Sequence, residues 1–549
     1  MTKFTTDLVQ SKVTRRGFAG GAAAVAGAMA LGRNVSFAAP AGKADLRKYG
    51  FQEGGNVIII GTLGEAASIN PFQTSESEGD WRCKMIFDEF VRMDPATYAP
   101  TPGDGLAKEW TIDGLTFTFT LNAANFSDGT PVTAADVEFT LLGHLAASTA
   151  SPRSDKFITI AGAAEYLAGT AEGVSGIEVV DDMTIKITLA SNDASFLLNL
   201  RYLFVAPKAA LEGKSLVDDA WFQAPIGAGP FLFESWSTGA DFVATKNPGY
   251  MHAGKPALDG FIHRVIADSN SLVLALQSNE IEGSIYPSPL LRSEIDKNAD
   301  LVVEVPPFNS PNGWMMNLSN EWLAKKEVRQ AIAMAINAEQ YAADSLLGLG
   351  KAGLGPIAPD SWAFDPELKA LPYDPAAAKA MLESVGATGI QLRAMVNQGN
   401  ILREDWLTFS QQALQEVGIE LIPEVIEYAT LVDRVTSTQD FDLCGVDFVG
   451  VTADPGELAG QFMTGAAGNY MKYSNPELDA LLEAARQELD IEVAKGLYKQ
   501  IQAIIVDDAP MYFAWYRPFM HVINKKYTNY TKSNLEGGLF RALENITLA

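Results

Sequence analysis

Residues 125–139 read NFSDGTPVTAADVEF and carry the two local signals that bear most on the fold of this 549-residue chain. Asp128-Gly129 is typical of a tight turn, because glycine adopts backbone conformations that other residues avoid. Thr133 is a residue type that caps helix N-termini, and it directly precedes the run Ala134–Phe139. The stretch therefore predicts a turn followed by a capped helix.

Strands are predicted on both sides of this stretch. Leu115–Leu121 and Thr184–Leu189 alternate apolar and polar side chains, which is typical of strands with one buried face. Val57–Ile60 is a continuous apolar run, as expected of a strand buried on both faces.

Helices are predicted most clearly in the second half of the chain. Glu327–Leu347 carries one apolar face and is expected to form a helix. A second helix is expected to open at Pro476, after the polar cap Asn475, and a third covers Ile491–Val506. Because helices and strands alternate here, the predicted fold class is α/β.

Composition excludes several classes of protein. The chain is 47% hydrophobic and 20% charged, with a formal net charge of −26, which argues against a nucleic-acid partner. Its four histidines are scattered, so we expect no metal site and no cofactor. Cys83 and Cys444 are interpreted as buried free thiols, with a disulfide as the alternative in an oxidising compartment.

Catalytic motifs are missing. Gly348–Gly353 matches the glycine spacing of dinucleotide-binding loops, but it follows a predicted helix instead of a strand, so we interpret it as a helix stop and turn. The sequence has neither a Gly-x-Ser-x-Gly elbow nor a His-Glu-x-x-His motif. We therefore predict that the protein is not an enzyme.

The first 38 residues resemble a targeting signal. Arg15-Arg16 precedes the uncharged, Ala- and Gly-rich run Ala19–Gly32, and Ser36-Phe37-Ala38-Ala39 follows, with small residues at the expected cleavage position. This order is typical of a secretory signal peptide, and the paired arginines resemble the twin-arginine type. We expect cleavage near Ala38 and a soluble periplasmic protein; the alternative is an N-terminal amphipathic helix.

Seven segments, taken in order, resemble the extracellular solute-binding proteins of peptide, opine and nickel ABC importers (family 5). Residues 125–139 resemble the family signature. The other six segments are Ile69–Phe72, Leu106–Trp110, Gly227–Phe231, Asn247–Tyr250, Val328–Ile332 and Tyr473–Asp479.

The resemblance implies a bilobed fold of the type II periplasmic-binding class, with an extra inserted domain and a ligand cleft between the lobes. Lobe I would comprise residues 39–86, 207–303 and 518–549. The inserted domain would span 87–206, and lobe II would span 304–517. Chain crossings at Glu304–Pro307 and Arg517–Met520 would form the hinge, where proline restricts the backbone.

The resemblance also implies candidate ligand-binding residues. Peptide-binding relatives carry an aspartate at the position of Val451, so simple dipeptides are expected to bind weakly unless Asp447 or Glu65 supplies the carboxylate. Arg403 would bind a ligand carboxylate, with a surface ion pair as the alternative. Trp81 and Trp314 are either ligand-stacking walls or core residues. The remaining candidates are Ser68, Asn317, Phe448 and Asp454.

Together these features predict a periplasmic, monomeric receptor. It would capture a small molecule or short peptide and deliver it to an inner-membrane permease with its ATPase. The alternatives are a chemotaxis receptor partner or a periplasmic chaperone with the same fold. The sequence does not identify the solute, because relatives with this fold bind different compounds.

Overall fold

The computed structural model describes residues 46–549, except 306–309, 347, 448–453, 518, 534 and 536. These residues belong to one compact unit, Lys43–Ala549. The predicted signal peptide, residues 1–38, lies outside the described residues, as do the prolines of both predicted hinge crossings. The predicted domain boundaries stay a prediction.

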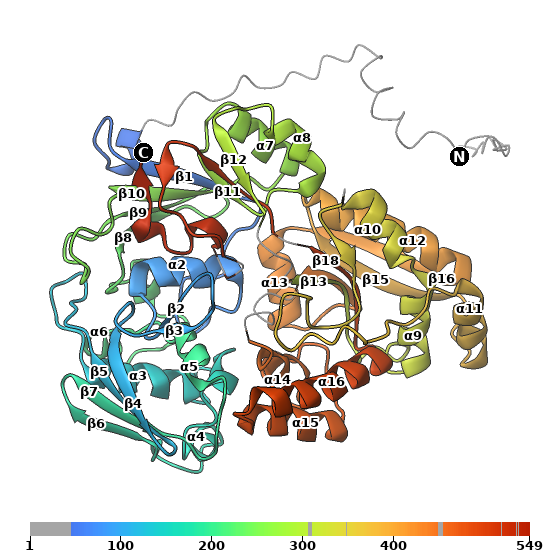
Figure 1. Ribbon diagram of the computed structural model, residues 1–549, viewed down its shortest axis with the longest axis horizontal. Helices are drawn as coiled ribbons and strands as arrows, with labels where there is room; N and C mark the ends of the chain where they lie inside the picture. The colour runs from blue at the N-terminus through green and yellow to red at the C-terminus, as the bar shows by residue number, and fades with distance from the viewer. Residues whose placement is uncertain are drawn as a thin grey trace, which may run out of the picture. The chain divides into compact units, whose positions relative to one another are not determined.

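A seven-stranded mixed sheet contains β1, the predicted apolar strand (Figure 1). All six residues of β1 are buried, and β1 runs parallel to both of its neighbours, β10 and β11. In spatial order the strands are β12 (Leu301–Glu304), β19 (His521–Asn524), β11 (Gly283–Ile285), β1 (Val57–Thr62), β10 (Gly260–Val265), β9 (Asp241–Lys246) and β8 (Phe231–Trp236).

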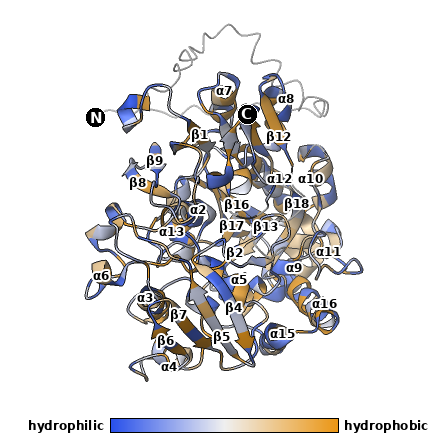
Figure 2. Cartoon of the chain, turned by 60° about the vertical axis from the view of Figure 1, so that its left-hand side comes forward, coloured by the Kyte–Doolittle hydropathy of each residue, from blue (hydrophilic) through white to orange (hydrophobic). Residues whose placement is uncertain are grey.

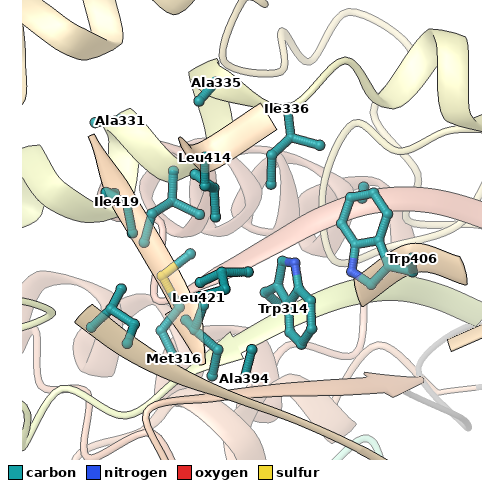
Figure 3. Close-up of a cluster of buried hydrophobic side chains, with 14 of the residues drawn as sticks. Trp314, Met316, Ala331, Ala335, Ile336, Ala394, Trp406, Leu414, Ile419 and Leu421 are labelled. Atoms are coloured by element: carbon teal, nitrogen blue, oxygen red, sulfur yellow. The ribbon is translucent and has the colours of Figure 1, made fainter. Parts of the chain in front are cut away.

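A second large sheet has six strands and is built from the later part of the chain. In spatial order they are β14 (Lys351–Ala352), β18 (Met511–Arg517), β13 (Ser310–Met316), β17 (Leu443–Asp447), β15 (Ile390–Asn397) and β16 (Ile419–Ile426). Trp314 on β13 and Trp406 on α12 (Ile401–Val417) lie in its apolar core with Leu421 (Figure 3). Packing of buried aromatic side chains thus joins this sheet to α12.

A third sheet has four antiparallel strands. Its order is β4 (Ala107–Asp113), β5 (Thr116–Leu121), β7 (Thr184–Thr188) and β6 (Ile177–Asp181). It contains β5 and β7, which confirms the two strands predicted from alternating apolar and polar side chains. Helix α3 (Ala134–Leu145) packs beside it (Figure 2). The predicted cap of α3 is confirmed: Asp136 Oδ2 accepts hydrogen bonds from the backbone N and Oγ1 of Thr133, both at 2.8 Å.

One helix prediction was wrong. Residues 327–347 do not form a single helix but split into α9 (Lys326–Ala335) and α10 (Ala338–Ser345). The backbone is extended at Ile336, and the Asn337 side chain accepts a hydrogen bond from the backbone N of Gln340. Asn337 caps a new helix, so one helix ends and another begins. The apolar side chains nevertheless keep a helical spacing on both sides of the break.

The other two predicted helices are confirmed. Asn475 caps α15 (Pro476–Gln487) by accepting hydrogen bonds from two backbone N–H groups, and α16 covers Ile491–Asp508. Strand β14 begins within Gly348–Gly353, so this segment lacks the helix that a dinucleotide-binding loop requires.

The remaining helices and strands are short or connect the sheets. They are α2 (Ser77–Phe87), α4 (Ala163–Leu167), α5 (Phe196–Asn199), α6 (Lys208–Leu211), α7 (Ser269–Gln277), α8 (Arg292–Ile295), α11 (Pro375–Ser384), α13 (Tyr428–Thr436), α14 (Glu457–Phe462), β2 (Arg92–Met93), β3 (Pro100–Thr101), β20 (Tyr527–Thr528) and β21 (Thr547–Leu548). Within the described part of the chain, no helix is long and apolar enough to span a membrane.

Candidate functional site

Two adjoining cavities lie where α2 approaches α13 and strand β17 of the six-stranded sheet. The large chamber has a volume of about 250 Å³ and the small chamber about 120 Å³. Ser77, Arg403, Tyr428 and Asp447 line both chambers. A partly open cavity lined by a few charged groups among apolar ones is typical of a ligand site.

The first turn of α2 contributes carboxylates to both chambers. Glu76 caps α2 by accepting hydrogen bonds from the backbone N of Glu78 and of Gly79, at 2.7 and 2.8 Å, and it lines the large chamber. Glu78 lines the small chamber, and its Oε1 accepts a hydrogen bond of 2.7 Å from Thr62 Oγ1.

Both carboxyls bind protons more tightly than ordinary glutamates. Burial raises the pKa of Glu78 to about 7. Burial, together with the nearby charges of Glu78 and Asp80, raises the pKa of Glu76 to about 8. His263 Nε2 lies 3.4 Å from Glu78 Oε2, but burial and the Arg82 guanidinium lower the pKa of His263 well below its usual range. The imidazole is therefore neutral and does not form an ion pair with Glu78.

Two arginines meet one carboxylate on the opposite wall. Asp447, at the end of β17, lies 3.3 Å from Arg403 Nη2 and 3.2 Å from Arg517 Nη2. Arg403 also donates a hydrogen bond of 2.8 Å from Nη1 to Asn397 Oδ1. One negative charge between two guanidinium groups leaves this wall with a surplus positive charge.

A third charged group joins two segments of the chain, one before β6 and one after α5, to α14. Lys156 Nζ lies 2.5 Å from Glu457 Oε2, and Arg201 Nη2 lies 2.9 Å from Glu457 Oε1. Although burial opposes ionisation of Glu457, the two cations hold its pKa at about 2. Glu457 is thus ionised throughout the neutral range, and Arg153 pairs with Asp80 nearby.

One wall of the large chamber is apolar. Leu431, Val432 and Val435 reach it from one face of α13, and Met315 and Val446 reach it from β13 and β17. The chamber therefore offers charged groups on one side and an aliphatic surface on the other. Among the described residues, no group of three or more His, Cys, Asp or Glu side chains could hold a metal ion.

Comparison with known proteins decides the family. The model of the bacterial extracellular solute-binding proteins, family 5 (middle part), matches residues 101–470. The chain belongs to this family. The resemblance that the seven motifs indicated is thereby confirmed.

Curated relatives of this family 5 protein cover most of its length. It is 29% identical over 499 residues to the glutathione-binding protein GsiB of Pectobacterium atrosepticum, covering 86% of this chain and 91% of the relative. It is 26% identical over 490 residues to the oligopeptide-binding protein AppA of Bacillus subtilis, covering 85% and 87%.

Solved structures confirm the bilobed α/β fold of the family 5 chain. The structure of AppA from Bacillus subtilis with a nonapeptide matches at a TM-score of 0.82, with 24% identity over 90% of this chain and 99% of that one. AgaA from A. tumefaciens with agropinic acid matches at 0.80, with 23% identity over 90% and 99%.

Two of the candidate ligand-binding residues line the chambers, namely Arg403 and Asp447. The alternative for Arg403, a surface ion pair, does not describe it, because its guanidinium is largely buried against Asp447. Asp454 lies outside the linings, where its Oδ1 accepts a hydrogen bond of 2.9 Å from Ser195 Oγ. Phe448 and Val451 lie outside the described residues.

The structure places the two candidate tryptophans in the core. Trp81 Nε1 donates a hydrogen bond of 2.9 Å to the Phe540 carbonyl, and Trp314 Nε1 donates one of 2.9 Å to Ser410 Oγ. Neither indole lines either chamber, so the core-packing alternative describes them.

The other three candidates have local partners and also lie outside both linings. Glu65 is buried, not a solvated loop acid: its Oε1 lies 2.5 Å from Arg82 Nη1, and its Oε2 accepts a hydrogen bond of 2.8 Å from the backbone N of Gly239. Asn317 Nδ2 donates to two backbone carbonyls, and Ser68 Oγ accepts from the backbone N of Asn70.

Proposed function

We propose that this protein is the solute-binding component of an ABC importer, and that it delivers its ligand to a membrane permease with an ATPase. The observation that carries the proposal is the pair of chambers lined by opposed charges in a family 5 chain. Relatives named for binding peptides or glutathione support a polar organic ligand.

The ligand is expected to be small. The two adjoining chambers hold about 250 and 120 Å³, which together lie near the lower end of the range of about 300–1,000 Å³ typical of sites for drug-sized ligands. AppA was solved with a nonapeptide. We propose that this protein instead takes a solute the size of an amino-acid derivative or a very short peptide, and performs no catalysis on it.

The remaining predictions belong to the same proposal. Residues 1–38 would direct export by the twin-arginine route to the periplasm. Residues 39–86, 207–303 and 518–549 would form lobe I, 87–206 the inserted domain and 304–517 lobe II, closing around the ligand as a monomer. The family description, which calls its members extracellular, supports the location.

A solute screen followed by an uptake assay tests this function. A ligand that binds the native state raises the melting temperature, so a thermal-shift screen of peptides, opines and sugars identifies it, and calorimetry then measures its Kd. Deleting the gene should abolish uptake of that solute by intact cells, and re-expression should restore it. A hit taken up equally well without the protein would contradict the importer role.

A further inference from the structure

The ion pairs of the two chambers leave an excess of carboxylates at α2. The basic side chains that line the chambers already pair with other acids, namely Arg153 with Asp80, Lys156 with Glu457, and both Arg403 and Arg517 with Asp447. Within the described ranges, neither Glu76 nor Glu78 has a lysine or arginine nitrogen within ion-pair distance.

Glu78 also has an unused hydrogen-bond acceptor. The residue is only 7% exposed, and its Oε2 accepts no hydrogen bond from any residue that the structure describes. A buried carboxylate oxygen without a donor is costly, and a donor on a bound molecule would satisfy it. His263 Nε2 lies 3.4 Å away without forming a hydrogen bond to it, and Glu78 lines the small chamber, so a solute in that chamber can supply the donor.

The wall formed by Arg403 and Arg517 has an unused hydrogen-bond donor. Arg517 lines the same small chamber and is 5% exposed, and among the described residues its Nε has no hydrogen-bond acceptor. The surplus positive charge of Arg403 and Arg517 around Asp447 therefore faces the carboxyl groups of Glu76 and Glu78, which become negatively charged only when they ionise. A molecule with one charge of each sign fits this arrangement.

We propose that Glu76 and Glu78 bind the ammonium group of a small zwitterionic solute, whose anionic group lies at Arg403 and Arg517. The inference rests on the proposed solute-binding function and names the chemical class of its ligand. The aliphatic face of α13 would receive an apolar part of the same molecule.

Asp447 and Glu65, the two acids that the sequence suggested for a ligand amine, are not available to bind the ammonium group. Asp447 is shared by two arginines, and Glu65 is held by Arg82. The expected weak binding of dipeptides assumed that no other acid could receive the ligand amine, and it stays a prediction that this proposal would revise. Glu76 and Glu78 can supply the carboxylate.

Ammonium binding at these carboxyls is coupled to proton release. The titratable and charged groups around them are Glu65 from the loop after β1, Asp80 and Arg82 on α2, His263 on β10, Arg403 on α12, Tyr428 on α13 and Asp447 on β17. Because Glu76 and Glu78 have raised pKa values, affinity should rise as the pH increases from 6 to 7.5, where the carboxyls begin to ionise and the ammonium group of a peptide, with an ordinary pKa near 8, keeps its proton.

Calorimetry and thermal shift on the purified protein test the proposal with matched probes. Alanylleucine, leucine and octopine carry both charges, whereas N-acetylalanylleucine and N-acetylleucine keep the carboxylate and lack the ammonium group. The variants are Glu76→Gln and Glu78→Gln, singly and together, with Glu212→Gln as a control at an exposed position outside both chamber linings.

We expect at least one zwitterion to bind and its acetylated counterpart to bind at least tenfold more weakly. Its affinity should rise about fivefold or more from pH 6 to 7.5 in the wild type, a range in which the ammonium group of the probe keeps its proton, and the double variant should lose at least tenfold and most of the pH dependence. Glu212→Gln should change neither.

Two outcomes separate the possible failures. A ligand from the wider screen that binds with equal affinity to the wild type and the double variant would overturn the role of the two acids and leave the solute-binding function intact. If no probe and no compound of the screen binds, the proposed function itself is contradicted. Far-UV circular dichroism of each variant excludes a folding defect as the cause.

Discussion

Glu78 makes the clearest prediction at the scale of single residues. Its pKa is about 7 in the folded chain and about 4.3 in an unfolded one, so the native state binds more protons between these values. The stability that the protonated carboxyl contributes is complete below about pH 4 and is lost as the pH rises through 7.

Replacing this carboxyl by an uncharged amide should remove the loss. We expect Glu78→Gln to raise the free energy of unfolding at pH 8.5 by about 1–3 kcal/mol relative to wild type, with little change at pH 4.5. Urea denaturation of the ligand-free protein at both pH values measures the difference. An equal effect at both values would show that packing, and not charge, decides.

The two thiols give a second prediction. Cys83 packs in the core beside the seven-stranded sheet and donates a hydrogen bond of 3.3 Å to the Ile69 carbonyl, whereas Cys444 lies on β17; both are free and buried. Burial raises the pKa of Cys444 to about 12, so little thiolate is present at neutral pH.

We therefore expect the native protein to react very slowly with a thiol reagent, and the denatured protein to react with two equivalents without prior reduction. Counting labelled thiols by mass spectrometry checks this. Finding no reactive thiol in the denatured protein would show a disulfide.

Some residues of the site could be predicted from the sequence and others could not. Arg403 and Asp447 could be proposed because they lie near motif segments, and both line the chambers. Glu76 and Glu78 were missed because acids in the first turn of a helix are ordinary capping residues, which gives no signal of ligand binding. Arg517 and Tyr428 were missed because only the tertiary fold brings them to α2.

At the scale of the element, local signals predicted α3, β5, β7, α15 and α16 well, since capping residues and periodicity act within a few residues. The same reasoning failed at Ile336-Asn337, where an apolar face continues through a helix break. Side-chain periodicity reports which face is buried, whereas the break depends on one capping contact that periodicity does not register.

The cap of α3 can be tested directly. Thr133→Ala removes the hydroxyl that contacts Asp136 and should lower the free energy of unfolding by about 1 kcal/mol. Thr133→Ser keeps the hydroxyl and should behave like wild type. Urea denaturation compares the three proteins; an alanine variant as stable as wild type would mean that the Thr133 hydroxyl adds nothing to the cap.

At the scale of the molecule, Glu457 connects segments far apart in the chain. Lys156 and Arg201 are buried against it, and replacing the carboxylate would remove one negative charge from beside two buried cations, which is strongly unfavourable. The segments can relieve this cost by separating and admitting water.

We therefore expect Glu457→Gln to enlarge the radius of gyration of the ligand-free protein in X-ray scattering and to weaken ligand binding about tenfold or more. Glu477→Gln, at an exposed acid on α15, is the control. An unchanged scattering profile together with unchanged affinity would show that this contact does not hold the segments together.

Export is also a property of the whole molecule. If Arg15-Arg16 is a twin-arginine signal, changing both residues to lysine should retain the precursor in the cytoplasm, because a receptor reads the arginine pair. Immunoblots of cell fractions measure this, with Lys3→Arg as the control. A normal periplasmic yield of the double mutant would contradict the assignment.

The position of β19 in the seven-stranded sheet has a consequence for biosynthesis. This strand, His521–Asn524, lies between β11 and β12, so the sheet stays divided until nearly the whole chain has left the ribosome. Until then β11 and β12 each present an open strand edge, and such edges attract other chains. The nascent protein should therefore depend on chaperones late in translation, and a ribosome that stalls before codon 521 would release a product prone to aggregation.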